Sequence, residues 1–334
     1  MGDGVTGRGL RHDALLYADD HDYLDAITAF VAAGRAADEP VMVAVPAHRL
    51  GQVGTALGAF AGVTLADMSA IGRNPAAIIP TALRDFVHRF PDRRLRIVGE
   101  SLWPGRRPAA YRHCVEHEAM INLALPAYSV SVLCLFDRSR LPADALADVG
   151  RTHPVVRSGA LARPSAGYQH PETVLAGCVE ALPPPPASAA TVRVEAAGLA
   201  ALRAAVAATA VAAGLPADRV DDLRIAVTEL AANAITHAGG PATARWWVAA
   251  PDELVCEISS HGTLTDPLAG RIPASMSAER GRGLLLVQQL CDLVDIRTVD
   301  GGTTVRVHLD LPAPAAVPAP RSAPDAAECG LAPL

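Results

Sequence analysis

The sequence has no long uncharged apolar run and no cluster of basic residues. No stretch reaches the ~18 uninterrupted apolar residues that a membrane helix needs, and the N-terminus lacks the apolar core of a signal peptide. The formal charge is -6, and no run of Lys and Arg occurs. Because nucleic-acid-binding domains usually carry a basic patch, the charge argues against direct nucleic-acid binding. We therefore expect a cytoplasmic protein without direct contact to a membrane or to nucleic acid.

Cysteine is also scarce and scattered. None of the six cysteines forms a C-x-x-C pair: Cys114, Cys134, Cys178, Cys256, Cys291 and Cys329. This spacing argues against a disulfide framework and against a zinc knuckle, so we expect buried, reduced thiols. Four residues of the first half match no strong metal-binding motif either: His12, His113, Cys114 and His117.

The length and one proline run indicate two domains. A chain of 334 residues suggests about two domains of ~150 residues, and half of the residues are apolar, enough for two cores. Four successive prolines at 183–186 cannot continue a helix or a central strand, so they predict an extended spacer. We place a linker at 181–192, between domains at 10–165 and 193–310. The Pro- and Ala-rich segment 311–334 has little periodicity and is expected to be a disordered tail.

The first half alternates strand-like and helix-like patterns. Apolar runs at 40–46, 95–99 and 129–136 predict buried strands, while residues 22–34 and 111–125 show helical spacing. Continuous apolar strands separated by helices predict an α/β domain with a mainly parallel sheet covered on both faces.

The second half has a different order of elements. Helices are expected at 196–213, 218–238 and 283–293, and strands at 244–250, 254–259 and 303–309. This order predicts an α/β sandwich with helices on one face of a mixed sheet.

Three polar residues recur along the helix expected at 218–238. Glu229, Asn233 and His237 follow one another at intervals of four residues, so they share a stripe beside the apolar face. A carboxylate and a carboxamide one turn apart suit a hydrated Mg²⁺ ion, which prefers oxygen ligands. The same pair is common on solvated helix surfaces, so the pattern alone does not identify a site.

Two glycine-containing segments follow this helix. Gly281 and Gly283 precede an apolar helix, where glycines and the helix dipole favour a bound anion. Gly301 and Gly302 precede an alternating strand. Each segment alone is equally compatible with an ordinary helix cap or hairpin turn.

Taken in this order, the three segments resemble the N box, the G2 box and the last strand of the Bergerat-type ATPase fold. That fold is shared by histidine kinases and anti-sigma-factor serine kinases, and the sequences of 229–238, 266–271, 279–297 and 301–309 look most like the RsbW-like anti-sigma branch. The resemblance implies that Glu229 is the catalytic base and that Asn233 is the Mg²⁺ ligand. It places further ATP-binding residues at His237, Ser260, Gly262, Gly281, Arg282, Gly283, Leu284, Thr303 and Thr304. Within that set, Gly281 and Gly283 would lie under the phosphates as a mobile lid, and Thr303 or Thr304 would lie near the adenine.

One position departs from the family pattern. Related domains carry an Asp two residues before a Gly, and this Asp accepts a hydrogen bond from the adenine amino group; here Ser260 stands before Gly262. A neutral hydroxyl is a weaker partner than a carboxylate. The loss could cost ~1–3 kcal/mol, or roughly tenfold to a hundredfold in affinity, unless a water or Asp266 compensates.

Motifs of the first half resemble the MEDS sensory domain, a module often joined to such ATPase domains. They include HDALLY at 12–17, RIVGESLWPGR at 96–106, SVLCLFD at 131–137 and RTHP at 151–154. The resemblance implies a RecA-like fold, although no P-loop motif follows any strand. We therefore expect a domain that senses a small molecule or a protein. The side chains expected near a pocket are Tyr17, Glu100, Glu118, Asn122 and Asp137.

The resemblance implies a regulatory serine/threonine kinase of the anti-sigma type, using ATP and Mg²⁺, and is compatible with a homodimer. Its partner would be a sigma factor or an anti-anti-sigma (STAS-type) protein. A non-catalytic anti-sigma module with a degenerate nucleotide site is an alternative. A sensor histidine kinase is a third reading, but it needs an acceptor His just before the ATPase domain, and residues 183–215 contain none; His170 lies upstream beside a proline.

Overall fold

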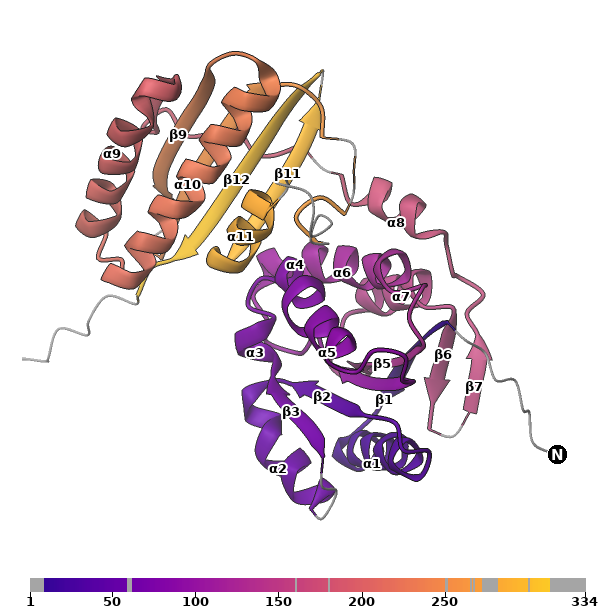
Figure 1. Cartoon of the computed structure of the whole chain (residues 1–334). Helices are drawn as coiled ribbons and strands as arrows, with labels where there is room; N and C mark the ends of the chain where they lie inside the picture. The colour runs from indigo at the N-terminus through magenta and orange to yellow at the C-terminus, as the bar shows by residue number, and fades with distance from the viewer. Residues whose placement is uncertain are drawn as a thin grey trace, which may run out of the picture.

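The computed structural model describes residues 9–58, 62–159, 161–179, 181–249, 252–264, 266, 268–271, 282–299 and 301–312. These residues form two sheets, each with its own helices (Figure 1). The first sheet is built from residues up to 164 and the second from residues after 189. Among the described residues, no helix has the length and apolarity that crossing a bilayer requires.

The N-terminal sheet has seven strands in the order β3-β2-β4-β5-β1-β6-β7. Their bounds are β1 Leu10–Tyr17, β2 Val41–Val45, β3 Val63–Asp67, β4 Leu95–Gly99, β5 Val130–Asp137, β6 Val155–Ser158 and β7 Leu161–Pro164. All neighbouring strands are parallel except β6 and β7. The central strand β5 is buried along its whole length, because helices cover both faces. The prediction of a mainly parallel sheet is confirmed.

Two separate cores lie on the two faces of this sheet. On one face, α1 (Asp20–Ala36) and α2 (Ala47–Leu57) cover the strands. On the other face lie α3 (Met68–Ile71), α4 (Pro75–Ile78), a π-helical turn (Ile79–Leu83), α5 (Arg84–Arg89), a 3₁₀ turn (Pro108–Ala110), α6 (Tyr111–Ala124) and α7 (Ala143–Thr152). A short helix, α8 (Pro171–Gly177), packs on α6. Helix α6 is almost wholly buried, which explains why polar residues on it face other side chains rather than water.

The C-terminal sheet has five strands in the order β11-β12-β10-β9-β8. They are β8 Ala190–Val194, β9 Ala242–Ala249, β10 Glu253–His261, β11 Leu293–Val299 and β12 Gly302–Asp310. Helices α9 (Leu199–Ala212), α10 (Ala217–Ala238) and α11 (Arg282–Leu290) lie on one face of the sheet, and a 3₁₀ turn (Ala196–Gly198) precedes α9 (Figure 1). The predicted α/β sandwich of the Bergerat type is confirmed.

Several details of the C-terminal prediction were wrong. Every neighbouring pair in this sheet is antiparallel, so the expected mixed sheet is corrected. The helix expected at 283–293 ends at Leu290, and β11 begins at Leu293. Strand β8 begins at Ala190, inside the segment that the sequence assigns to the linker. Of the segment expected as a tail, residues 313–334 lie outside the described residues.

Candidate functional site

Helix α10 positions the polar stripe that the sequence predicts. Its apolar side chains Val220, Leu223 and Val227 are buried against the sheet, which fixes the rotation of the helix about its axis. Glu229 and Asn233 are therefore held half-buried at the flank of that face. The helix ends at Gly239, whose left-handed conformation (φ 63°) favours glycine.

The N-terminal end of α11 meets this stripe at Gly283. A Cβ atom placed on Gly283 would lie 2.9 Å from Nδ2 of Asn233 and still closer to the Glu229 carboxylate. Only a residue without a side chain allows this approach. The structure thus brings together the acidic side chain, the amide side chain and the glycine at the tip of α11.

A cavity of about 670 Å³ lies beside this junction, between α10, the end of β10 and β12. Its volume falls within the range of about 300–1,000 Å³ that is typical of small-molecule sites. Its wall includes six of the residues predicted to bind the nucleotide: Asn233, His237, Ser260, Gly262, Leu284 and Thr303. Residues that are separated by 70 positions in the sequence therefore share one cavity.

The remaining predicted site residues lie around the cavity or away from it. Glu229 reaches the start of α11 outside the cavity wall, and Arg282 at the first position of α11 is exposed. Thr304 pairs with Ser259 through hydroxyl groups 3.1 Å apart, whereas Thr303 lines the cavity. Gly281 lies outside the described residues.

The position that departs from the family pattern lies in the cavity wall. Ser260 is opposite Thr303 in the β10–β12 ladder, and Asp266 lines the same cavity. The Thr303 hydroxyl donates to the Gly262 carbonyl oxygen over 2.7 Å and ties down the turn after β10. The wall of the cavity that contains Ser260 therefore also contains a carboxylate, which comes from the segment after β10.

A second cavity of about 430 Å³ adjoins the first at the boundary between the two domains. Leu264, Asp266 and Ala269 line both cavities. Its other walls come from both domains, through α6 with Glu116 and Met120, α8, and β11 with Val294 and Ile296. The candidate nucleotide site therefore touches the surface on which the N-terminal domain packs.

Buried polar contacts join the two domains along this surface. The Asn74 side-chain amide donates to the Gln288 backbone carbonyl over 2.8 Å and to the Gln288 side chain over 2.9 Å, and both residues are buried. Arg271 directly follows Gly270, which lines the first cavity, and its guanidinium donates to the Glu116 carboxylate of α6 over 3.2 Å. Gln288 belongs to α11, so the N-terminal domain contacts the same helix whose amino end lies against Glu229.

Charged groups surround Asp295 at the same boundary. Its carboxylate pairs with Arg112 and lies 3.4 Å from Nε2 of His113, both on α6, and 3.2 Å from Nε2 of His308. Hydrogen bonds from the two histidines hold the pKa of Asp295 below its usual range, against the effect of burial. Breaking this buried network from one side would leave an unpaired charge, which is costly.

The N-terminal residues expected near a pocket separate into two buried groups. At the carboxyl end of the sheet, the hydroxyl groups of Tyr17 and Tyr23 each donate to Glu100 over 2.9 Å. Burial raises the pKa of Glu100 to about 7. Asp137 instead caps the turn after β5 by accepting from the Ser139 amide over 2.9 Å.

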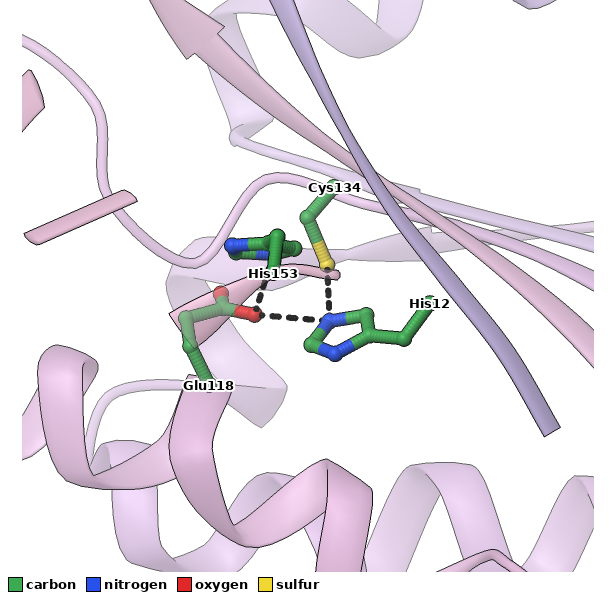
Figure 2. Close-up of side chains that lie close together, drawn as sticks. All are labelled: His12, Glu118, Cys134 and His153. Atoms are coloured by element: carbon green, nitrogen blue, oxygen red, sulfur yellow. Dashed lines mark hydrogen bonds and ion pairs between the residues drawn. The ribbon is translucent and has the colours of Figure 1, made fainter. Parts of the chain in front are cut away.

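Glu118 and Asn122 form the second group, together with three residues that sequence reasoning did not assign to a site. His12, Cys134 and His153 approach Glu118 from separate elements (Figure 2). The sequence carried a signal for them, since a His in a buried strand and a His in the RTHP motif are unusual polar residues in a core. These residues lie far apart in the sequence, so their proximity in space could not be predicted from it.

Both halves of the chain are similar to known protein families. Residues 11–154 match the family model of the MEthanogen/methylotroph, DcmR Sensory domain (MEDS). Residues 192–309 match the family model of the histidine kinase-like ATPase domain. The chain therefore joins a MEDS domain to a histidine kinase-like ATPase domain.

A comparison with solved structures finds the RsbU and RsbW domains of a protein from Mycobacterium tuberculosis. The identity is 16%, the TM-score is 0.29, and the match covers 38% of this chain and 34% of the other. The matched region spans about a third of that chain's length. No curated protein matched the sequence.

Proposed function

We propose that the C-terminal domain binds ATP with Mg²⁺ in the 670 Å³ cavity, and that the chain is an anti-sigma-factor-type serine/threonine protein kinase. The observation that carries the proposal is the meeting of Glu229, Asn233 and Gly283 beside that cavity. Carboxylate and amide oxygens suit Mg²⁺, and the amino end of α11 suits phosphate. The substrate is a Ser or Thr hydroxyl of a STAS-type anti-anti-sigma protein, and the second partner is a sigma factor.

The residues of this chain would have separate tasks in the transfer. Asn233 would hold the Mg²⁺ ion, which would neutralise charge on the phosphates when bound. Glu229 accepts the proton of the attacking hydroxyl or orients it, and the tip of α11 faces the phosphates. Asp266 takes the place of the absent family carboxylate at Ser260 and accepts from the adenine amino group.

The N-terminal domain would control this reaction through the domain boundary. Its contacts reach Gln288 in α11 and Arg271 beside the cavity. A signal that shifts α4 or α6 would therefore change the position of the phosphate-binding helix tip. We propose a cytoplasmic regulator in which ATP-dependent phosphorylation follows the state of the MEDS domain.

The test is phosphoryl transfer from γ-labelled ATP to purified STAS-domain proteins. We expect acid-stable label on Ser or Thr of the acceptor, and we expect Glu229→Gln to bind ATP but not to transfer. Label that stays on this chain and is lost in acid would instead identify a histidine kinase. The structure gives that reading no support among the described residues, because α9 is part of the ATPase core through Leu202 and Val206 rather than a separate hairpin.

The Ser260 substitution favours one alternative, a binding module that has lost nucleotide affinity. Two variants separate the alternatives. If the site is active, Asp266→Asn weakens ATP binding about tenfold or more, and Ser260→Asp strengthens it modestly. Undetectable binding in the wild type that becomes strong only in Ser260→Asp would contradict the kinase proposal.

A further inference from the structure

Four buried side chains converge inside the N-terminal domain, on the face of the sheet covered by α6 and α7. His12 comes from β1, Glu118 from α6, Cys134 from β5 and His153 from the end of α7 (Figure 2). Each is at most 3% exposed. A group with this composition is unusual in a core, because ionisable side chains are rarely buried unless they are paired or bind a metal.

The distances within the group match those around a tetrahedral metal ion. Oε2 of Glu118 lies 3.3 Å from Nε2 of His12 and 3.4 Å from Nε2 of His153, and Nε2 of His12 lies 3.4 Å from Sγ of Cys134. All four atoms lie within 4.8 Å of one another. Zinc–ligand bonds of about 2.0–2.3 Å in a tetrahedron separate neighbouring ligand atoms by about 3.3–3.8 Å.

The other nitrogen of each ring fixes its tautomer. Nδ1 of His153 lies 2.9 Å from the Val149 carbonyl oxygen, and Nδ1 of His12 lies 3.1 Å from the Asn122 side-chain oxygen. The Asn122 amide nitrogen donates to the Thr152 carbonyl over 3.0 Å, which orients its oxygen toward His12. The Thr152 hydroxyl also lies 2.9 Å from Nδ1 of His153, but it donates to the Asp148 carbonyl over 2.9 Å. Because the Val149 and Asn122 oxygens only accept, each Nδ1 carries a proton, and a neutral ring then presents its Nε2 lone pair to the centre of the group.

Nitrogen lone pairs that face a carboxylate need a proton or a metal cation between them. Among the residues that the structure describes, Nε2 of His153 has no hydrogen-bond partner, although it lies 3.4 Å from Glu118. The second carboxylate oxygen of Glu118 accepts from the Ser101 hydroxyl, so that one oxygen remains directed at the histidines. Partners of this kind orient the ligands of structural metal sites.

We propose that His12, Glu118, Cys134 and His153 bind one divalent, thiol-seeking metal ion of the Zn²⁺ class. Two neutral imidazoles, a thiolate and a carboxylate balance the charge of a divalent ion, and the Cys134 thiol releases its proton to solvent on binding. Four protein ligands complete a tetrahedron without an open position. The neighbouring cavity, lined by Glu118 and Cys134, has a volume of only about 10 Å³, so the site holds the ion and no substrate.

The experiment uses the full chain, purified without a histidine tag. We expect about one equivalent of zinc per chain by elemental analysis after dialysis. Replacement by Co²⁺ is expected to give the intense visible bands of tetrahedral cobalt and a thiolate-to-cobalt charge-transfer band. In Cys134→Ser the charge-transfer band is lost, and in His153→Gln the metal affinity falls by more than a hundredfold. Asn122→Ala, which frees the His12 ring, lowers affinity by about tenfold to a hundredfold.

Two buried residues of the same domain provide matched controls. Cys114→Ser and His117→Gln alter a thiol and an imidazole that lie outside the group, and we expect both variants to keep the metal and the cobalt spectrum. The proposal is wrong if the wild-type chain binds neither zinc nor cobalt, since the group is then a hydrogen-bonded cluster with a protonated histidine. It is also wrong if the charge-transfer band survives in Cys134→Ser. The first outcome is measured on the wild-type chain and the second by the cobalt spectrum of Cys134→Ser. Neither measurement depends on ATP binding.

Discussion

The candidate sites of the two domains hold their polar groups in different ways. In the ATPase domain, Asn233 is half-buried and His237 exposed, and both line an open cavity of about 670 Å³. In the MEDS domain, Glu100 and Glu118 are at most 3% exposed and are bonded to neighbouring side chains. The first arrangement leaves room for a ligand the size of a nucleotide. The second leaves room for no more than an ion or a proton.

This difference indicates how each domain responds to its surroundings. An open site gains its energy when the ligand arrives, so single substitutions should change binding more than stability. A buried polar group already contributes to the folded state, so substitutions there should change stability. Substitutions in the two kinds of site should therefore separate effects on binding from effects on folding.

Asn233→Ala should have the largest effect on binding and a small effect on folding. We expect a loss of Mg²⁺-dependent ATP affinity of at least about 100-fold, which is ~2.7 kcal/mol, because the metal loses its protein ligand. The measurement is titration calorimetry with a parallel thermal melt. Thr228→Ala is the matched control, because its hydroxyl bonds to the Arg224 carbonyl on the same helix. An affinity equal to that of the wild type would remove the role assigned to Asn233.

Glu100 should make the stability of the MEDS domain depend on pH. Burial raises its pKa from 4.5 to about 7, so the folded state holds a proton that the unfolded state releases in this range. Its stabilising contribution is complete below pH 4.5 and is lost as the pH rises through about 7, at most ~3 kcal/mol. We expect Glu100→Gln to remove this slope in denaturant unfolding at a series of pH values. The exposed Glu172→Gln should keep it, and an unchanged slope in Glu100→Gln would contradict the assignment.

Gly283→Ala should affect both properties, because it lies where the cavity meets the core. The added methyl group would overlap the Glu229 carboxylate and crowd Asn233, so both side chains must leave their present positions. We expect a stability loss of ~1–3 kcal/mol and weaker ATP binding. Gly240→Ala is the control, since nothing lies within 4 Å of a Cβ at that position. Equal stability of the two variants would show that the helix tip does not approach Glu229.

The Asn74–Gln288 contact should couple the two domains by a smaller amount. A double-mutant cycle with Asn74→Ala and Gln288→Ala measures the interaction itself, and we expect ~1 kcal/mol of coupling between the two substitutions. In each variant, differential scanning calorimetry should also show a larger difference between the unfolding temperatures of the two domains than in the wild type. Additive effects would indicate that the domains do not share this contact in solution.

Much of the fold could be predicted from the sequence because its strongest patterns are local. Strand β4 spans the predicted residues 95–99, and α10 differs from its prediction by one residue at its start. Strand β11 was missed because its apolar residues follow α11 after only two positions and continue the helical spacing. The direction of strand pairing in the second sheet was wrong, since a period of two residues does not depend on the direction of the neighbour.

The sites were predictable to different degrees for the same reason. Glu229 and Asn233 lie on one helix, so their spacing alone places them together. His12, Cys134 and His153 come from three separate elements, and more than a hundred positions separate His12 from the other two. Only the parallel pairing of β1 with β5 brings His12 close to Cys134. The presence of Asp266 in the same cavity wall as Ser260 likewise depends on a segment whose course the sequence does not specify.

The most direct test of the account is a calorimetric titration of the full wild-type chain with ATP, in the presence and absence of Mg²⁺. We expect saturable binding of one ATP per chain that requires Mg²⁺ and competes with ADP. No binding under either condition, or binding that is indifferent to Mg²⁺, would contradict the nucleotide site between α10 and β12.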